Sequence, residues 1–100
     1  MEITLKYSAQ IKQAAGTAYE TLSVQGPCTA SEILKQVAAS HEALQSMLYE
    51  SKETIRPSLL LFVGEDQVTG EHMLEDGDVL TLMSPIAGGL NGKNGTGLQE

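Results

Sequence analysis

The chain has 100 residues, of which 41% are hydrophobic and 19% are charged, the composition of a single globular domain with one modest core. Thirteen acidic residues against six basic ones give a net charge of −7, which argues against nucleic-acid binding. The acidity either suits a basic protein partner or serves solubility alone. No apolar run is long enough for a membrane helix, the N-terminus lacks signal-peptide features, and Cys28 is the only cysteine, so we expect a cytoplasmic protein without an internal disulfide.

Residues 1–24 predict two strands joined by a short helix. Residues 2–7 alternate apolar and polar side chains, which is typical of a strand with one buried face. Ser8 as an N-cap and Gly16 as a C-terminal stop enclose one or two predicted helical turns. Alternation resumes in residues 18–24, which indicates a second strand.

The best-marked helix begins just after Cys28. Thr29 and Glu32 have the T-x-x-E spacing of a capping box, in which each side chain accepts a hydrogen bond from the other residue's backbone amide. Cys28 and Ile33 have the spacing of a hydrophobic staple, and an apolar stripe follows along Ile33, Leu34, Val37 and Ala38. Because no basic partner for a thiolate is evident, we interpret Cys28 as a packed small hydrophobe rather than a nucleophile.

The second half of the chain predicts a second short helix and three strands. Leu44, Met47 and Leu48 indicate the helix. Residues 59–63 form a strand that is apolar at every position, so both of its faces need to be covered. The main helix can cover one face, and either the second helix or a protein partner covers the other; the partner is the favoured interpretation. A brief strand around Val68 follows, and then a last strand at residues 79–83, in which Leu80 and Leu82 oppose Val79, Thr81 and the outward Met83.

This order of elements predicts an α+β fold of two layers, in which a mixed five-stranded sheet packs on one main helix. The connection from the second strand to the third passes over the main helix, so we expect those two strands to be parallel neighbours. Residues 90–100 are rich in glycine and have little to bury, which predicts a disordered C-terminal extension after a domain of residues 1–89.

No set of side chains predicts catalysis or metal binding. His41 and His72 are the only histidines, and neither has metal-ligand spacing to other candidate ligands, so both are interpreted as surface residues. Asp76 and Asp78 flank Gly77 in a pattern typical of a tight turn. The sequence contains no P-loop, no nucleophile elbow and no dinucleotide-binding glycine motif after a strand.

The glycine pair Gly88-Gly89 is the remaining candidate. Glycines without side chains can pass through a channel too narrow for other residues, and Pro85 stiffens the exit from the last strand. If Gly89 became the C-terminus, its carboxylate could be activated by another enzyme as an acyl adenylate. The alternative is that the glycine pair only begins a flexible linker that continues through residues 90–100.

Two motifs at opposite ends of the chain carry a family resemblance. The first comprises Tyr7, Ala9-Gln10-Ile11-Lys12 and Gly16-Thr17, and the second comprises Leu74, Asp76-Gly77-Asp78, Pro85-Ile86 and Gly88-Gly89. Together with the order of strands and helix between them, they resemble the MoaD-like small subunit of molybdopterin synthase, within the ThiS/MoaD family of ubiquitin-like sulfur carriers. The resemblance covers residues 2–89 and implies a β-grasp fold.

The resemblance also implies a function as a carrier subunit that is not an enzyme by itself. An E1-like adenylating enzyme that uses ATP would activate Gly89 and convert it to a thiocarboxylate, with Gly88 lining the tail. The tail would then enter the large subunit of molybdopterin synthase and give its sulfur to a pterin precursor during molybdenum cofactor biosynthesis. The carrier would bind no metal or cofactor itself. The residues expected to bind the partner are Leu59, Leu61, Val63, Met83, Pro85 and Ile86.

Two departures from the family pattern leave alternatives open. Ser84 stands where the family usually has the first proline of a pair, which changes little. Family members generally end at the glycine pair, whereas here residues 90–100 follow and block activation of Gly89. A processing protease that cuts after Gly89, a leftover linker, or a diverged protein that keeps its tail and only binds partners would each explain the extension. A carrier for another sulfur acceptor, such as thiamine or cysteine, is a further alternative.

Overall fold

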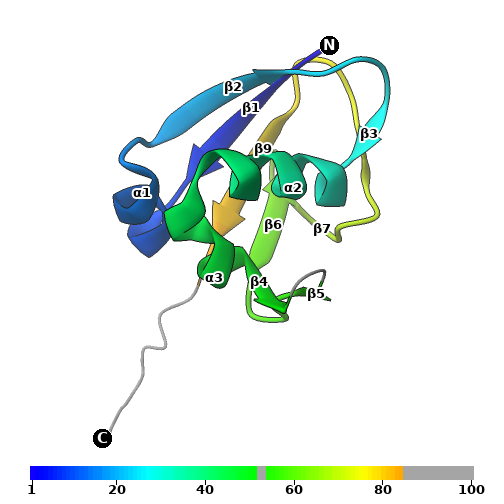
Figure 1. Ribbon diagram of the computed structural model, residues 1–100. Helices are drawn as coiled ribbons and strands as arrows, with labels where there is room; N and C mark the ends of the chain where they lie inside the picture. The colour runs from blue at the N-terminus through cyan, green and yellow to red at the C-terminus, as the bar shows by residue number, and fades with distance from the viewer. Residues whose placement is uncertain (52–53, 85–100) are drawn as a thin grey trace, which may run out of the picture.

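The computed structural model describes residues 1–51 and 54–84, and its largest feature is a mixed five-stranded sheet. Inside the sheet β1 (Glu2–Tyr7) and β9 (Val79–Met83) pair in parallel, and the other neighbouring strands are antiparallel. The full order across the sheet is β2 (Tyr19–Ser23), β1, β9, β6 (Leu60–Val63) and β7 (Asp66–Val68) (Figure 1). The predicted mixed sheet of five strands is therefore confirmed.

The prediction that the strands before and after the main helix are neighbours in this sheet is wrong. β2 and β6 run in the same direction, as the crossover predicts, but β1 and β9 lie between them. The last strand inserts there because its apolar residues meet apolar residues on both sides: Leu80 pairs with Leu5, and Leu82 pairs with Leu61. All four side chains are buried, so this position brings more apolar surface into the core than a place at the edge would.

The main helix, α2 (Ala30–Ser40), begins at the predicted capping box. The Glu32 amide donates to Thr29 Oγ1 at 3.2 Å, and the Thr29 amide donates to Glu32 Oε1 at 2.8 Å. The expected second helix consists of a 3₁₀ turn, η1 (Glu42–Leu44), followed by α3 (Gln45–Leu48). Within the residues that the structure describes, no helix is both long and apolar enough to cross a membrane.

The short N-terminal helix, α1 (Ala9–Ala15), has the predicted ends. Gly16 closes it in the left-handed conformation, with φ of 79°, and the Gly16 amide donates to the Lys12 carbonyl at 3.0 Å. Ser8 occupies the N-cap position, but its side chain makes no capping hydrogen bond. The position of Ser8 was therefore predicted correctly and its capping role was not.

Two small strand pairs complete the described structure and were not predicted. β3 (Cys28–Thr29) pairs with β8 (Met73–Leu74) next to the start of α2, and β4 (Tyr49–Ser51) pairs with β5 (Thr54–Ile55) after α3. Each has only two or three residues in a strand, which is too short for an alternation pattern to be visible in the sequence.

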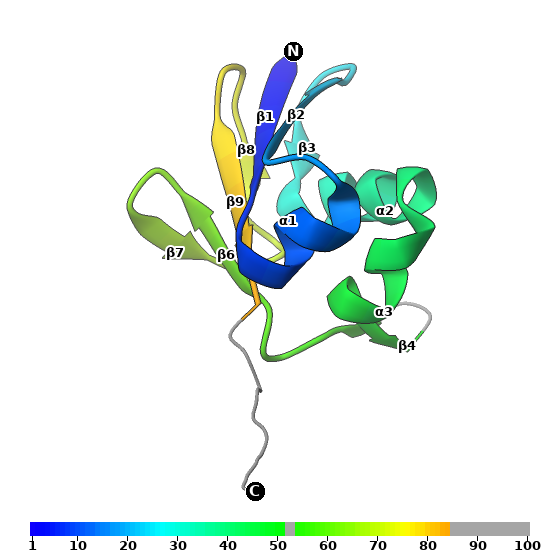
Figure 2. The ribbon, with the colours of Figure 1, turned by 90° about the vertical axis from the view of Figure 1, so that its left-hand side faces the viewer.

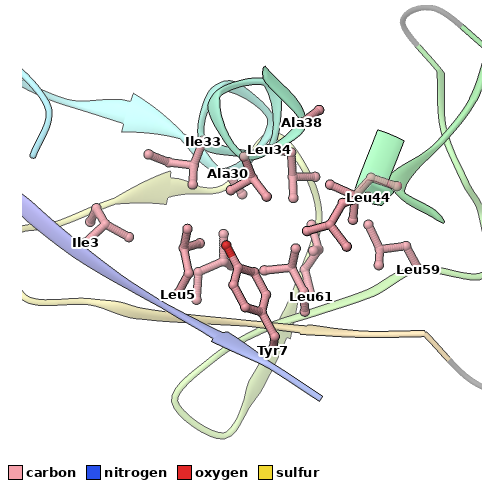
Figure 3. Close-up of a cluster of buried hydrophobic side chains, with 14 of the residues drawn as sticks. Ile3, Leu5, Tyr7, Ala30, Ile33, Leu34, Ala38, Leu44, Leu59 and Leu61 are labelled. Carbon is pink, nitrogen blue, oxygen red and sulfur yellow. The ribbon is translucent and has the colours of Figure 1, made fainter. Parts of the chain in front are cut away.

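The core lies between one face of the sheet and α2, with α3 at its end (Figure 2). Figure 3 shows Ala30, Ile33, Leu34 and Ala38 of α2 facing Leu5 and Tyr7 of β1 and Leu61 of β6. The apolar stripe predicted for this helix is therefore its buried face.

Cys28 belongs to this core and is 8% exposed. Burial raises the pKa of the Cys28 thiol, which keeps the sulfur protonated and makes it a poor nucleophile. This agrees with its interpretation as a packed small hydrophobe.

Candidate partner interface

The face of the sheet that is turned away from α2 carries a group of apolar side chains. Alternation in β9 turns Leu80 and Leu82 into the core and leaves Val79 and Met83 39% and 38% exposed on the opposite side. On that side the strand register places Leu60 beside Met83 and Phe62 beside Thr81. We define the outer face by these side chains and their neighbours across the sheet: Lys6, Tyr19, Leu60, Phe62, Val79, Thr81 and Met83.

The helices leave the outer face open. α2 and α3 lie on the other side of the sheet (Figure 2), and Leu44 and Leu48, from η1 and α3, are fully buried in the core. The second helix therefore does not cover the outer side of β6, the first of the two possibilities that the sequence left open. In the part of the chain that the structure describes, Leu60 and Phe62 remain partly exposed.

The structure corrects the predicted direction of the side chains in β6. Leu59 and Leu61 are only 8% and 4% exposed, and Val63 packs against the core, so none of these three belongs to the outer face. Leu61 pairs with Leu82 and Val63 with Leu80, and paired residues share a face of the sheet. Of the predicted partner-binding residues in the described part of the chain, only Met83 lies on the outer face.

The sequence missed Leu60 and Phe62 because β6 has apolar residues on both faces. A strand with no alternation gives no sign of which residues point outward. The available signal was the neighbouring strand: β9 alternates clearly, and pairing it with β6 in the observed register would have identified Leu60 and Phe62. The register itself could not be read from the sequence.

The first family-like motif lies beside the end of β9. Tyr7, from the first motif, pairs with Leu82, and the Ser8 amide donates to the Leu82 carbonyl at 3.3 Å. Ser84 follows directly and is the last residue of the described ranges. The predicted site residues Pro85, Ile86, Gly88 and Gly89, and the predicted extension of residues 90–100, lie outside the described residues, so these assignments remain predictions.

A polar cluster ties the sheet to the end of α2 on the core side. The Tyr7 hydroxyl donates to Glu20 Oε1 at 2.6 Å, and His41 Nε2 lies 2.7 Å from the same oxygen. The hydrogen bond from Tyr7 is the main cause of a lowered pKa of the Glu20 carboxyl, and burial raises the pKa of the Tyr7 phenol. His41 was expected at the surface, but its side chain is 20% exposed and contacts Glu20, which gives it a structural role.

Among the described residues there is no group of three or more histidine, cysteine, aspartate or glutamate side chains that could hold a metal ion. The polar cluster has one carboxylate and one imidazole, and its tyrosine is 2% exposed. The hydrogen bonds of this cluster hold β1, β2 and the end of α2 together, so its role is to stabilise the fold. Among the described residues, the outer face is the feature suited to binding another protein.

Comparison with known proteins places this geometry in context. The sequence pattern of the ThiS family matches residues 5–89. The molybdopterin synthase sulfur carrier subunit of Chlamydomonas reinhardtii is 26% identical over 94 residues, which cover 89% of this chain and 100% of the relative. Small archaeal modifier protein 3 of Haloferax volcanii is 28% identical over 93 residues, which cover 89% of this chain and 100% of that relative.

Solved structures agree on the fold. The crystal structure of small archaeal modifier protein 1 from H. volcanii superposes with a TM-score of 0.82 at 21% identity, covering 89% of this chain and 100% of that one. The complex of subunits 1 and 2 of the molybdopterin-converting factor from Helicobacter pylori includes a chain that superposes with a TM-score of 0.57 at 18% identity. The superposition covers 89% of this chain and 100% of that one. These likenesses confirm the ubiquitin-like β-grasp fold.

Proposed function

Because the chain belongs to the ThiS family of ubiquitin-like sulfur carriers, we propose that it is the small, sulfur-carrying subunit of a molybdopterin synthase. The observation that carries the proposal is the position of the open apolar face. Met83 lies on this face and is six residues before Gly89 in the chain. A partner that covers the outer face therefore binds a segment that is close in sequence to the glycine pair.

The proposed chemistry takes place on the carboxylate of Gly89 after residues 90–100 have been removed. An E1-like enzyme joins this carboxylate to the AMP part of ATP and releases pyrophosphate. A sulfur donor then displaces AMP and leaves a thiocarboxylate. In the large synthase subunit the sulfur passes to a pterin precursor, and a water oxygen restores the carboxylate. This role needs a cytoplasmic protein, as the sequence predicts.

Within this scheme the described residues bind the partner and position the domain on it, and they take no part in the reaction. Burial of apolar surface on association stabilises a complex. Methionine and aromatic side chains are common in such interfaces. Leu60, Phe62 and Met83 form the centre of the proposed contact. The tail needs no side chains of its own, because glycine can pass through a narrow channel.

Adenylation in vitro tests the proposal. A chain ending at Gly89 and the full chain are each incubated with ATP and the E1-like enzyme of the same cell, and pyrophosphate release is measured. We expect release with the shorter chain and none with the full chain, because only the former has a free glycine carboxylate. A Gly89→Ala variant of the shorter chain is the control and should react far more slowly. Equal release from both lengths, or none from either, would contradict the proposal.

A second candidate is a protein modifier, favoured by the similarity to the two small archaeal modifier proteins. A modifier uses the same activated glycine but transfers it to a lysine amine, so that an isopeptide bond replaces the thiocarboxylate. Peptides from the native cell that carry Gly88-Gly89 on lysine would support this function. A thiocarboxylate at Gly89 in the absence of such peptides would support the sulfur-carrier function.

A further inference from the structure

A groove on the helix side of the molecule is not used by the proposed function. It has a volume of about 750 Å³ and lies where α2, α3 and β4 meet. This volume is in the range of small-molecule sites. Figure 1 shows α3 and β4 next to one end of α2, on the side of the sheet that faces away from the outer face. Ala38 and Ala39 form part of the lining, and their small side chains leave room between the elements.

The charge of the groove differs from that of the rest of the chain. Among the described residues the basic side chains are Lys6, Lys12, Lys35 and Arg56, and the last two line the groove with a single acid, Glu50. The protein has a net charge of −7, so a local excess of positive charge is unusual on its surface. Such a spot attracts an anion and not a cation.

Several hydrogen-bond donors in the groove are held in place by the backbone. Arg56 Nε donates to the Ser46 carbonyl at 2.6 Å, and Gln45 Nε2 donates to the Ala38 carbonyl at 3.0 Å. The Arg56 amide also donates to the Leu48 carbonyl at 2.9 Å, which fixes the backbone at this wall. An anchored guanidinium keeps its terminal nitrogens available and loses less freedom when it binds an oxyanion in the two-pronged mode.

Tyr49 adds an aromatic ring to the lining. Its hydroxyl oxygen is buried and has no hydrogen-bond partner among residues 1–51 and 54–84, and a buried polar group in that state is uncommon in folded proteins. The ring offers a flat apolar surface to the body of a ligand.

We propose that this groove binds a small organic anion, in which a carboxylate or phosphate contacts Lys35 and Arg56 and a flat apolar body packs on Tyr49. The two basic side chains favour a negatively charged ligand. The ring and the two alanines favour a ligand with a flat apolar body. Because the groove and the outer face lie on opposite sides of the sheet, the ligand and a partner on the outer face can bind at the same time.

The experiment uses the full chain labelled with ¹⁵N and follows backbone amide shifts during titration with phenyl phosphate and, separately, with benzoate. We expect saturable shifts centred on Lys35, Gln45 and Tyr49 with at least one probe, and the stronger probe identifies the preferred anion. Inorganic phosphate should produce much smaller shifts, because it lacks the flat body.

The double variant Lys35→Gln with Arg56→Gln should weaken binding by about tenfold or more. A Lys12→Gln variant is the matched control, since it removes an exposed positive charge on α1, and should bind like the unchanged protein. Tyr49→Leu keeps apolar bulk but removes the flat ring, and should also weaken binding. Absence of shifts with both organic probes, inorganic phosphate acting as strongly as phenyl phosphate, or equal binding by the double variant and the Lys12 control would overturn the proposal.

Discussion

At the scale of single residues, Glu20 connects three parts of the fold through one oxygen atom. Tyr7 and His41 both contact Glu20 Oε1, and the pKa of the Glu20 carboxyl lies below its ordinary value of 4.5. A lowered folded-state pKa means that the charged carboxylate is favoured by folding. Its contribution to stability is therefore present above pH 4.5 and is lost as the pH falls through the folded-state pKa.

Replacing Glu20 with Gln should lower the free energy of unfolding by about 1–2 kcal/mol at pH 7, because two hydrogen bonds lose their charged acceptor. The difference from the unchanged protein should shrink as the pH falls toward 3. Urea unfolding at several pH values measures both effects. Glu65→Gln, in an exposed turn, is the matched control and should change stability little. A constant difference across this pH range would show that the charge of Glu20 has no role.

At the scale of elements, the adjoining strands β6 and β9 contribute side chains with opposite roles. Leu61→Asp should lower the free energy of unfolding by roughly 3–5 kcal/mol, because it places a charge in the core without a partner. Met83→Asp on the adjoining strand should leave the fold intact, since Met83 is 38% exposed. The same change should weaken binding to the large synthase subunit by about tenfold or more, as for residues at the centre of an interface.

Gln36→Asp is the matched control for this prediction. It adds the same charge to an exposed position on α2, which lies on the other side of the sheet from the outer face. Calorimetric titration of each variant with the large subunit compares their affinities, and urea unfolding checks that both are folded. If the two variants bind equally well, the outer face beside the tail is not the docking surface.

The elements that the sequence predicted are those with local signals. The pair Thr29 and Glu32 identified the start of α2, Gly16 identified the end of α1, and alternation in β9 correctly placed Met83 at the surface. These features depend on residues within one or two turns of each other.

The missed features depend on contacts between distant parts of the chain. The place of β9 between β1 and β6 is set by side-chain packing across the whole sheet, which no short pattern encodes. The same register decides that Leu60 and Phe62 point outward while Leu59 and Leu61 do not. The candidate site was therefore located on the correct strand but with the wrong residues of that strand.

At the scale of the whole molecule, the sheet separates two surfaces that are suited to binding. The parallel pairing of β1 with β9 places Tyr7, from the first motif, beside Leu82, two residues before the last described residue, Ser84. The outer face is open on one side of the sheet, and the core and the charged groove lie on the other.

The central claim is that Gly89 becomes a sulfur-bearing C-terminus, and the intact mass of the untagged protein from its native cells tests it most directly. We predict a chain that ends at Gly89, with a fraction of the molecules heavier by the difference between sulfur and oxygen. A population that consists only of chains retaining residues 90–100 would contradict the carrier function and leave a ubiquitin-like domain that binds partners without carrying sulfur.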